Sequence, residues 1–311
     1  MEVCNNSQKN SGSLFLVILS GVGAALSYYY PFFALTMLSV PALWAAAAFK
    51  SRRGFMTLLL LTVWTYVFGL ITGNGALPSL LNLGFIAPAG ILLYVLQRQS
   101  MGNTRSVLYL SVVLTFGLFL VFCVPSLQRY GDAYAEINSY FAQISAPFAE
   151  NAALKENVEL AQKILPDIFL SFLYSLGALY ALVNVRFLHH MNRRHKDMPL
   201  CPMAPFGNWS LPRLYGPVLF SAVLVLLLLE YAGITSFSAA TNLLYEMLML
   251  PMMLLGAQFI YRIFLLRRGP KSARRITILL TAALLVLGGF VLFLLGMFSS
   301  FGPGRIRKEK P

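Results

Sequence analysis

The sequence predicts an all-α protein, a polytopic transmembrane helical bundle of about eight or nine spans. Of the 311 residues, 58% are hydrophobic and only 11% are charged, and the mean hydropathy is +0.70. Soluble domains carry about 25% charged residues. Long runs such as 223–229 are apolar on every face, whereas the strands of a membrane barrel alternate between apolar and polar residues. Helices are therefore the predicted spanning elements.

The candidate spans are apolar stretches long enough for a bilayer core, which takes about 20 residues. They cover about 14–30, 32–49, 55–72, 80–97, 107–124, 167–188, 214–231, 241–266 and 276–298. Lys and Arg gather after every second stretch, and the loops 73–79 and 232–240 contain neither. Because basic loops stay in the cytoplasm, we expect a multi-pass protein of the bacterial inner (cytoplasmic) membrane with a cytoplasmic N-terminus. The side of the C-terminus stays open.

These stretches divide into an N-terminal membrane bundle of about five spans, 1–124, and a C-terminal membrane bundle of about four, 167–298. A basic tail follows at 299–311. Between the bundles, 125–166 is acidic on balance and is predicted to be an extracytoplasmic connector. Its apolar spacing predicts two amphipathic helices broken near Pro147. They either lie on the membrane surface or cap the outer mouth of the bundle.

The net charge of +13 comes from loops between apolar runs, which favours anionic lipid headgroups over nucleic acid as the partner. Cys4, Cys123 and Cys201 are scattered, which predicts neither a disulfide framework nor a zinc site. The first apolar run continues into the aromatic cluster 28–30, so we expect a retained helix and not a signal peptide.

Motifs for ATP hydrolysis, nucleophilic catalysis and metalloproteases are missing from the sequence. We therefore expect a protein that is not an enzyme and has no cofactor. His189, His190 and His195 lie in a strongly basic loop. A solvated topology anchor is the favoured interpretation of these histidines, and a metal site is the alternative.

Polar side chains inside spans are candidate ligand-binding residues, because a charge in hydrocarbon is costly. Glu246 stands alone in an apolar helix that also contains Gln258, and Pro251 between them frees a backbone carbonyl at a predicted kink. One interpretation is a solute pocket lined by Glu246, Gln258, Asn82, Trp64, Tyr28, Tyr29 and Tyr30. The other is helix–helix hydrogen bonding by Glu246 and by amides such as Asn82 and Asn184.

Two features are candidate partner interfaces. Ser20 and Ala24 have small-x-x-x-small spacing, which permits close contact within the bundle or with a partner helix. Segment 205–213, here called the elbow, contains two prolines with Trp209 and Arg213 just before a span. It is predicted either to anchor at headgroup depth or to dock a partner.

Three short motifs give a resemblance to a known family. They are the segment from Tyr30-Pro31 to Pro41 with a basic turn at 50–54, Trp209-Ser210-Leu211-Pro212 before a long span, and a final pair of spans with an arginine-containing tail. In these motifs the chain resembles the YybS-like bacterial membrane proteins, a family of unknown function. That family is similar to the S-components of energy-coupling-factor vitamin transporters.

The resemblance implies an S-component-like bundle whose first spans enclose a small-molecule site open to the outside. It also implies that the Ser20 and Ala24 face meets a coupling subunit. We therefore expect small-solute binding or transport without an ATPase of its own, served by separate coupling or ATPase subunits, in a protein that contacts membrane lipid. The alternative is a membrane scaffold or assembly factor that recruits cytoplasmic partners.

Overall fold

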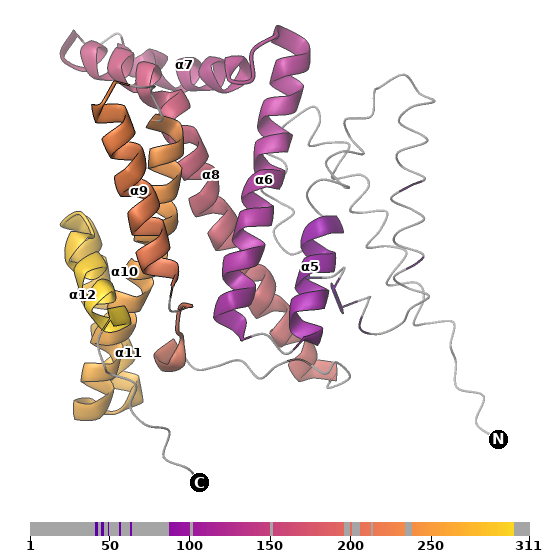
Figure 1. The fold of residues 1–311 in the computed structure, drawn as a ribbon, viewed down its shortest axis with the longest axis vertical. Coiled ribbons are helices and arrows are strands. Elements are labelled where there is room, and N and C mark those ends of the chain that lie inside the picture. The colour runs from indigo at the N-terminus through magenta and orange to yellow at the C-terminus, as the bar shows by residue number, and fades with distance from the viewer. Residues whose placement is uncertain are drawn as a thin grey trace. The chain divides into compact units, whose positions relative to one another are not determined.

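The computed structural model describes residues 87–99, 102–149, 152–195, 200, 206–212, 214–233 and 238–301, with single positions 41, 42, 45, 46, 49, 56 and 63. All secondary-structure elements in these ranges are helices (Figure 1). The chain forms two compact units: Met1–Gly102 with Ser106–Cys201, and Asn103–Arg105 with Pro202–Pro311. Both predicted bundle boundaries, 124 and 166, fall inside the first unit.

Three helices in the described ranges are long and apolar enough to cross a membrane: Asn103–Tyr130, Lys155–Asn192 and Ser238–Arg267. They overlap the predicted spans 107–124, 167–188 and 241–266. Tyr215–Tyr231 and Phe290–Ser300 are apolar but shorter. The first three predicted spans lie outside the described residues except for single positions, so the number of eight or nine spans stays a prediction.

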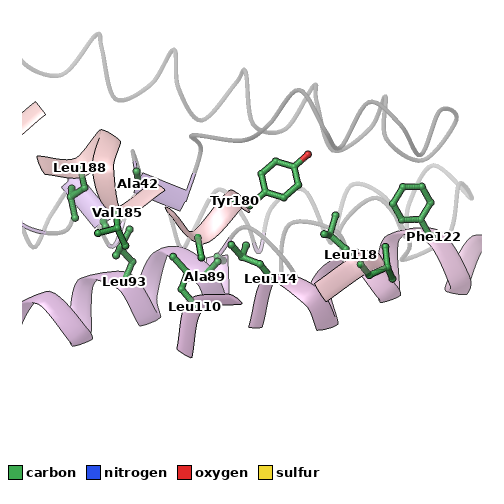
Figure 2. Packing of buried hydrophobic residues seen from close by; sticks show 14 of the residues in the cluster. Ala42, Ala89, Leu93, Leu110, Leu114, Leu118, Phe122, Tyr180, Val185 and Leu188 are labelled. Atoms are coloured by element: carbon green, nitrogen blue, oxygen red, sulfur yellow. The ribbon is translucent and has the colours of Figure 1, made fainter. Parts of the chain in front are cut away.

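The first unit contains α5 (Ala87–Arg98), α6 (Asn103–Tyr130) from Ser106 onward, α7 (Ala135–Ala149) and α8 (Ala152–His195). Every fourth residue along one face of α6 is buried, and α8 buries a face of the same kind, because residues at this spacing lie one above another. The buried residues are Leu110, Leu114, Leu118 and Phe122 on α6, and Phe169, Leu173, Ala181 and Val185 on α8. With Ala42, Ala89 and Leu93 they form one apolar core (Figure 2).

The connector differs from the prediction in its boundaries. Helix α6 continues to Tyr130 and ends at Gly131, whose φ of 72° is left-handed and whose N–H bonds Leu127 O at 2.9 Å. Pro147 lies inside α7, which runs crosswise to α6 (Figure 1). Helix α8 then runs for 44 residues through Pro166. The second connector helix and the following span are therefore one helix.

The second unit contains η3 (Phe206–Asn208), α9 (Tyr215–Tyr231), α10 (Ser238–Arg268), α11 (Pro270–Val286) and α12 (Phe290–Phe301). Helix α10 is its centre and packs against all four other elements. The core consists of Leu248, Met252, Leu255 and Phe293. Large apolar residues such as Val218 and Leu228 on α9 and Leu279 on α11 are exposed, as expected of surfaces that face lipid.

Candidate functional site

The proline inside α10 leaves a backbone carbonyl without its helical donor. Pro251 has no N–H, so the carbonyl of Met247, four residues earlier, loses its intrahelical hydrogen bond. The Tyr215 hydroxyl, from the first turn of α9, donates to that carbonyl at 2.6 Å. The sequence predicted the freed carbonyl but not its donor, because the donor comes from another helix.

The predicted last span, 276–298, is not one helix but two. Helix α11 ends at Val286 and α12 begins at Phe290. Gly288 and Gly289 have φ values of 94° and 68°, and their N–H groups bond Leu285 O at 3.0 Å and Leu284 O at 2.9 Å. This is a Schellman ending, which favours glycine because left-handed backbone strains other residues.

The interruptions of α10 and of α11–α12 lie close together. A side chain at Gly289 would collide with the methyl end of Met253, which is two residues past Pro251. Farther along, a side chain at Gly256 would collide with Leu292 O, and one at Gly296 with Met252 O. Helices α10 and α12 therefore cross with their backbones in contact, as small residues permit in membranes.

The intramembrane carboxylate predicted from the sequence belongs to this region. Glu246 lies on α10, one residue before Met247 and five before Pro251. Its side chain is half-buried and interacts with neighbouring groups. The structure thus places a carboxylate and a proline interruption five residues apart on α10, with the glycine break against Met253 of the same helix.

Gln258 and Trp209, predicted for two different roles, contact each other. The buried Gln258 side chain donates from Nε2 to the Trp209 carbonyl at 2.9 Å. The Phe206 ring packs edge-on against Trp209, with centroids 5.7 Å apart, and against Tyr261 of α10, with centroids 6.0 Å apart. The described part of the elbow is therefore fixed to α10.

A protein family described as "Predicted membrane protein (DUF2232)" matches residues 15–300. The chain belongs to this family. Its long apolar helices fit that description, so it is an integral membrane protein whose outer faces contact lipid. No curated protein and no solved structure matches the chain. The resemblance to YybS-like proteins and S-components, the inner-membrane location and the orientation stay predictions.

In this DUF2232 family member, a buried amide of the first unit bonds to backbone groups. Asn184 on α8 accepts from Ala42 N–H at 2.9 Å and donates to Tyr180 O at 2.8 Å. Pro41 precedes Ala42, and proline is typical of a helix's first turn, where N–H groups lack intrahelical acceptors. Asn184 therefore forms a hydrogen bond between helices, which is the role that the sequence analysis gave to such amides.

The junction of α6 and α7 holds a partly buried ion pair that sequence reasoning missed. Arg129 Nη1 lies 3.3 Å from Glu136 Oε1, with the Glu136 side chain only 9% exposed. The Ser126 hydroxyl donates to Asp132 O at 2.7 Å and accepts from Glu136 N–H at 3.0 Å. Burial, and then the Glu136 carboxylate, raise the pKa of the Tyr140 hydroxyl.

The remaining predicted site residues lie outside the described ranges. They are Tyr28, Tyr29, Tyr30, Trp64 and Asn82 of the solute pocket, and Ser20, Ala24 and Arg213 of the partner interfaces. Their roles stay predictions. Within the described ranges, no three His, Cys, Asp or Glu residues are grouped so that they could hold a metal ion.

Proposed function

We propose that the chain binds a small solute in the membrane and moves it across, as S-components do with separate coupling subunits. The observation that supports this best is the meeting of two interrupted membrane helices. Transporters place their solute sites near the middle of the membrane, where broken helices expose backbone groups. Pro251 of α10 and the Gly288–Gly289 break meet at Met253, and Glu246 lies on the same helix seven residues before Met253, about 10 Å along its axis.

The lengths of α11 and α12 support the same proposal. At 1.5 Å per residue, their 17 and 12 residues extend about 25 and about 18 Å, each short of a hydrocarbon core about 30 Å thick. Both helices are nevertheless mostly apolar. Short apolar helices joined by a glycine break are typical of transporter sites, because the ends of such helices supply N–H and C=O groups for a solute.

Glu246 would then provide the charged contact. A carboxylate within an apolar helix is costly and is typical of a proton-binding site or of a partner for a cationic solute.

A ligand-induced thermal shift tests the proposal. Purified full-length protein in lipid nanodiscs would be screened against vitamins, metal ions and nucleobases. A ligand at 100 times its Kd stabilises the folded state by about 2.7 kcal/mol, so we expect at least one compound to raise Tm by about 5 °C.

Glu246→Gln should abolish that shift while leaving the Tm of the free protein within about 1 °C. Glu230→Gln, at the end of α9, is the matched control and should retain the shift. If no compound in the panel shifts Tm, and a cytoplasmic protein co-purifies in fixed ratio, the solute proposal is wrong.

That second outcome would support the alternative, a membrane scaffold. One observation favours it. Gln258, Tyr261 and Phe206 fix the elbow to α10, while the neighbouring side chains Asn208 and Ser210 are exposed. A fixed segment with exposed polar groups suits protein docking, because little entropy is lost on binding.

A further inference from the structure

The segment from Trp209 to Tyr215, here called the brace, contacts α10 on both sides of its proline. At one end, the Tyr215 hydroxyl bonds Met247 O at 2.6 Å, before Pro251. At the other end, Trp209 O accepts from Gln258 Nε2 at 2.9 Å, after Pro251. Met247 and Gln258 are eleven residues apart, about 16 Å along the helix. The brace therefore spans the interruption.

Local hydrogen bonds order the two ends of the brace. Trp209 N–H bonds Phe206 O at 3.3 Å, and Tyr215 N–H bonds Pro212 O at 3.0 Å. Pro212 fixes its own φ angle. The Phe206 ring links the Trp209 end to Tyr261, one turn past Gln258. Each end of the brace is therefore held both by a local turn and by a contact with α10.

The hydrogen bond from Tyr215 affects the shape of α10, because its acceptor, Met247 O, is the carbonyl that Pro251 leaves without a donor. A proline weakens a helix because one backbone bond is missing and the ring clashes with the preceding turn, which produces a bend. In hydrocarbon, a freed carbonyl needs a donor from a neighbour. The Tyr215 hydroxyl is that donor, so the bend angle depends on where the brace holds the hydroxyl.

We propose that the brace sets the bend of α10 at Pro251, with Tyr215 as the positioning residue and Gln258 as the anchor. Movement of the brace changes the bend, and with it the position of Glu246 and of the α12 crossing. The proposal concerns the shape of α10 and does not depend on whether a solute is bound.

A double-mutant cycle on the full-length protein tests the Tyr215 bond. Tyr215→Phe should lower Tm by about 2 °C, the effect of one hydrogen bond in a chain of this size. In a Pro251→Ala background the Ala N–H can serve Met247 O, so the same change should lower Tm by less than half as much. Tyr231→Phe, on the same helix and 94% exposed, is the control and should leave Tm unchanged. Equal losses in both backgrounds would overturn the assignment of the hydroxyl.

Distance measurements test the bend itself. Spin labels at Ala240→Cys and Leu266→Cys, both exposed on α10, would be attached in a background lacking Cys4, Cys123 and Cys201. A straight helix would hold these positions about 39 Å apart.

Tyr215→Phe and Gln258→Met should each shift or broaden the distance distribution, and Pro251→Ala should narrow it again in the Tyr215→Phe protein. Each variant would be measured only as a monodisperse, cooperatively unfolding sample. If both single variants keep the parent distribution, the brace does not control α10 and the proposal fails. If Gln258→Met does not fold, Tyr215→Phe alone decides between the two results.

Discussion

In the first unit, α6 and the part of α8 that follows Pro166 pack against each other along unbroken stretches of helix. In the second unit, α10 and the α11–α12 pair are instead interrupted where they meet. Ser111 and Thr115 on α6 bond carbonyls of their own helix, each at 2.7 Å. Tyr215 and Gln258 instead bond backbone groups of another element.

This difference in hydrogen bonding between the two units indicates which helices can change shape. A polar group that bonds its own helix does not fix the position of a neighbouring helix. The α6–α8 contact is built around the apolar core, and the Asn184 amide bonds α8 to Ala42 and not to α6. The second unit relies on bonds between elements, which can break and reform one at a time. We therefore expect α10 to change shape more readily than α6 or α8.

The largest effect should come from filling the α10–α12 crossing. Gly296→Leu would force a side chain into the Met252 carbonyl, which belongs to a helix backbone and cannot move aside. Overpacking costs about 1–3 kcal/mol or more, so we expect loss of folded protein or a fall in Tm of more than about 5 °C, measured by unfolding in detergent.

Gly177→Ala sharpens the comparison with the first unit. A Cβ added at Gly177 would meet Thr115 Oγ1 at 2.5 Å and Ser111 O at 2.9 Å. The α6–α8 contact is therefore close, but not as close as the α10–α12 crossing. We expect a smaller fall than for Gly296→Leu. Gly102→Ala, with nothing within 4 Å of the added Cβ, should behave as the parent. A larger loss at Gly177 than at Gly296 would contradict the ranking.

A smaller effect is expected for the amide that joins α8 to Ala42. Asn184→Ala would leave the buried Ala42 N–H without its acceptor, which costs about 1–3 kcal/mol. We expect Tm to fall by about 3 °C. Asn208→Ala, on an exposed side chain, is the control. An unchanged Tm for Asn184→Ala would mean that the first unit does not depend on this bond.

The smallest expected effect is the difference in stability lost when one or the other of two ion pairs of the first unit is removed. Glu136→Gln removes a partly buried pair and should cost about 1 kcal/mol, because Arg129 is still 31% exposed and solvent screens it. Glu159→Gln removes the Lys155 pair, in which both side chains are 64% exposed, and should be close to neutral. Urea unfolding of the two variants measures the difference, and equal costs would contradict it.

Composition and apolar run length predicted the helical membrane bundle, because lipid leaves few other choices. They also predicted the Glu246–Pro251 region, since a lone carboxylate and a proline are visible against an apolar background. They did not predict the break in 276–298. Gly288-Gly289 stands inside a run whose hydropathy is continuous, and only the backbone conformation shows that the chain turns there.

The start of α8 also differs from the prediction, because the predicted span begins at 167 and the helix begins at Ala152. A proline at 166 suggests a boundary, yet the helix continues through it. The carbonyl that Pro166 frees belongs to Gln162, whose side chain is exposed. Water or headgroups can reach an exposed position of this kind, so the helix can continue through the proline. The Tyr215–Met247 bond and the Gln258–Trp209 bond join distant parts of the sequence, and no local pattern indicates them.

Pro166 lies inside α8, and a proline produces a bend in a helix. The 29 residues that follow it, up to His195, extend about 44 Å, more than the thickness of a hydrocarbon core. A tilt of about 5° around the midpoint of this part would displace each of its ends by about 2 Å, so a small rotation of α8 becomes a translation at the α7–α8 corner.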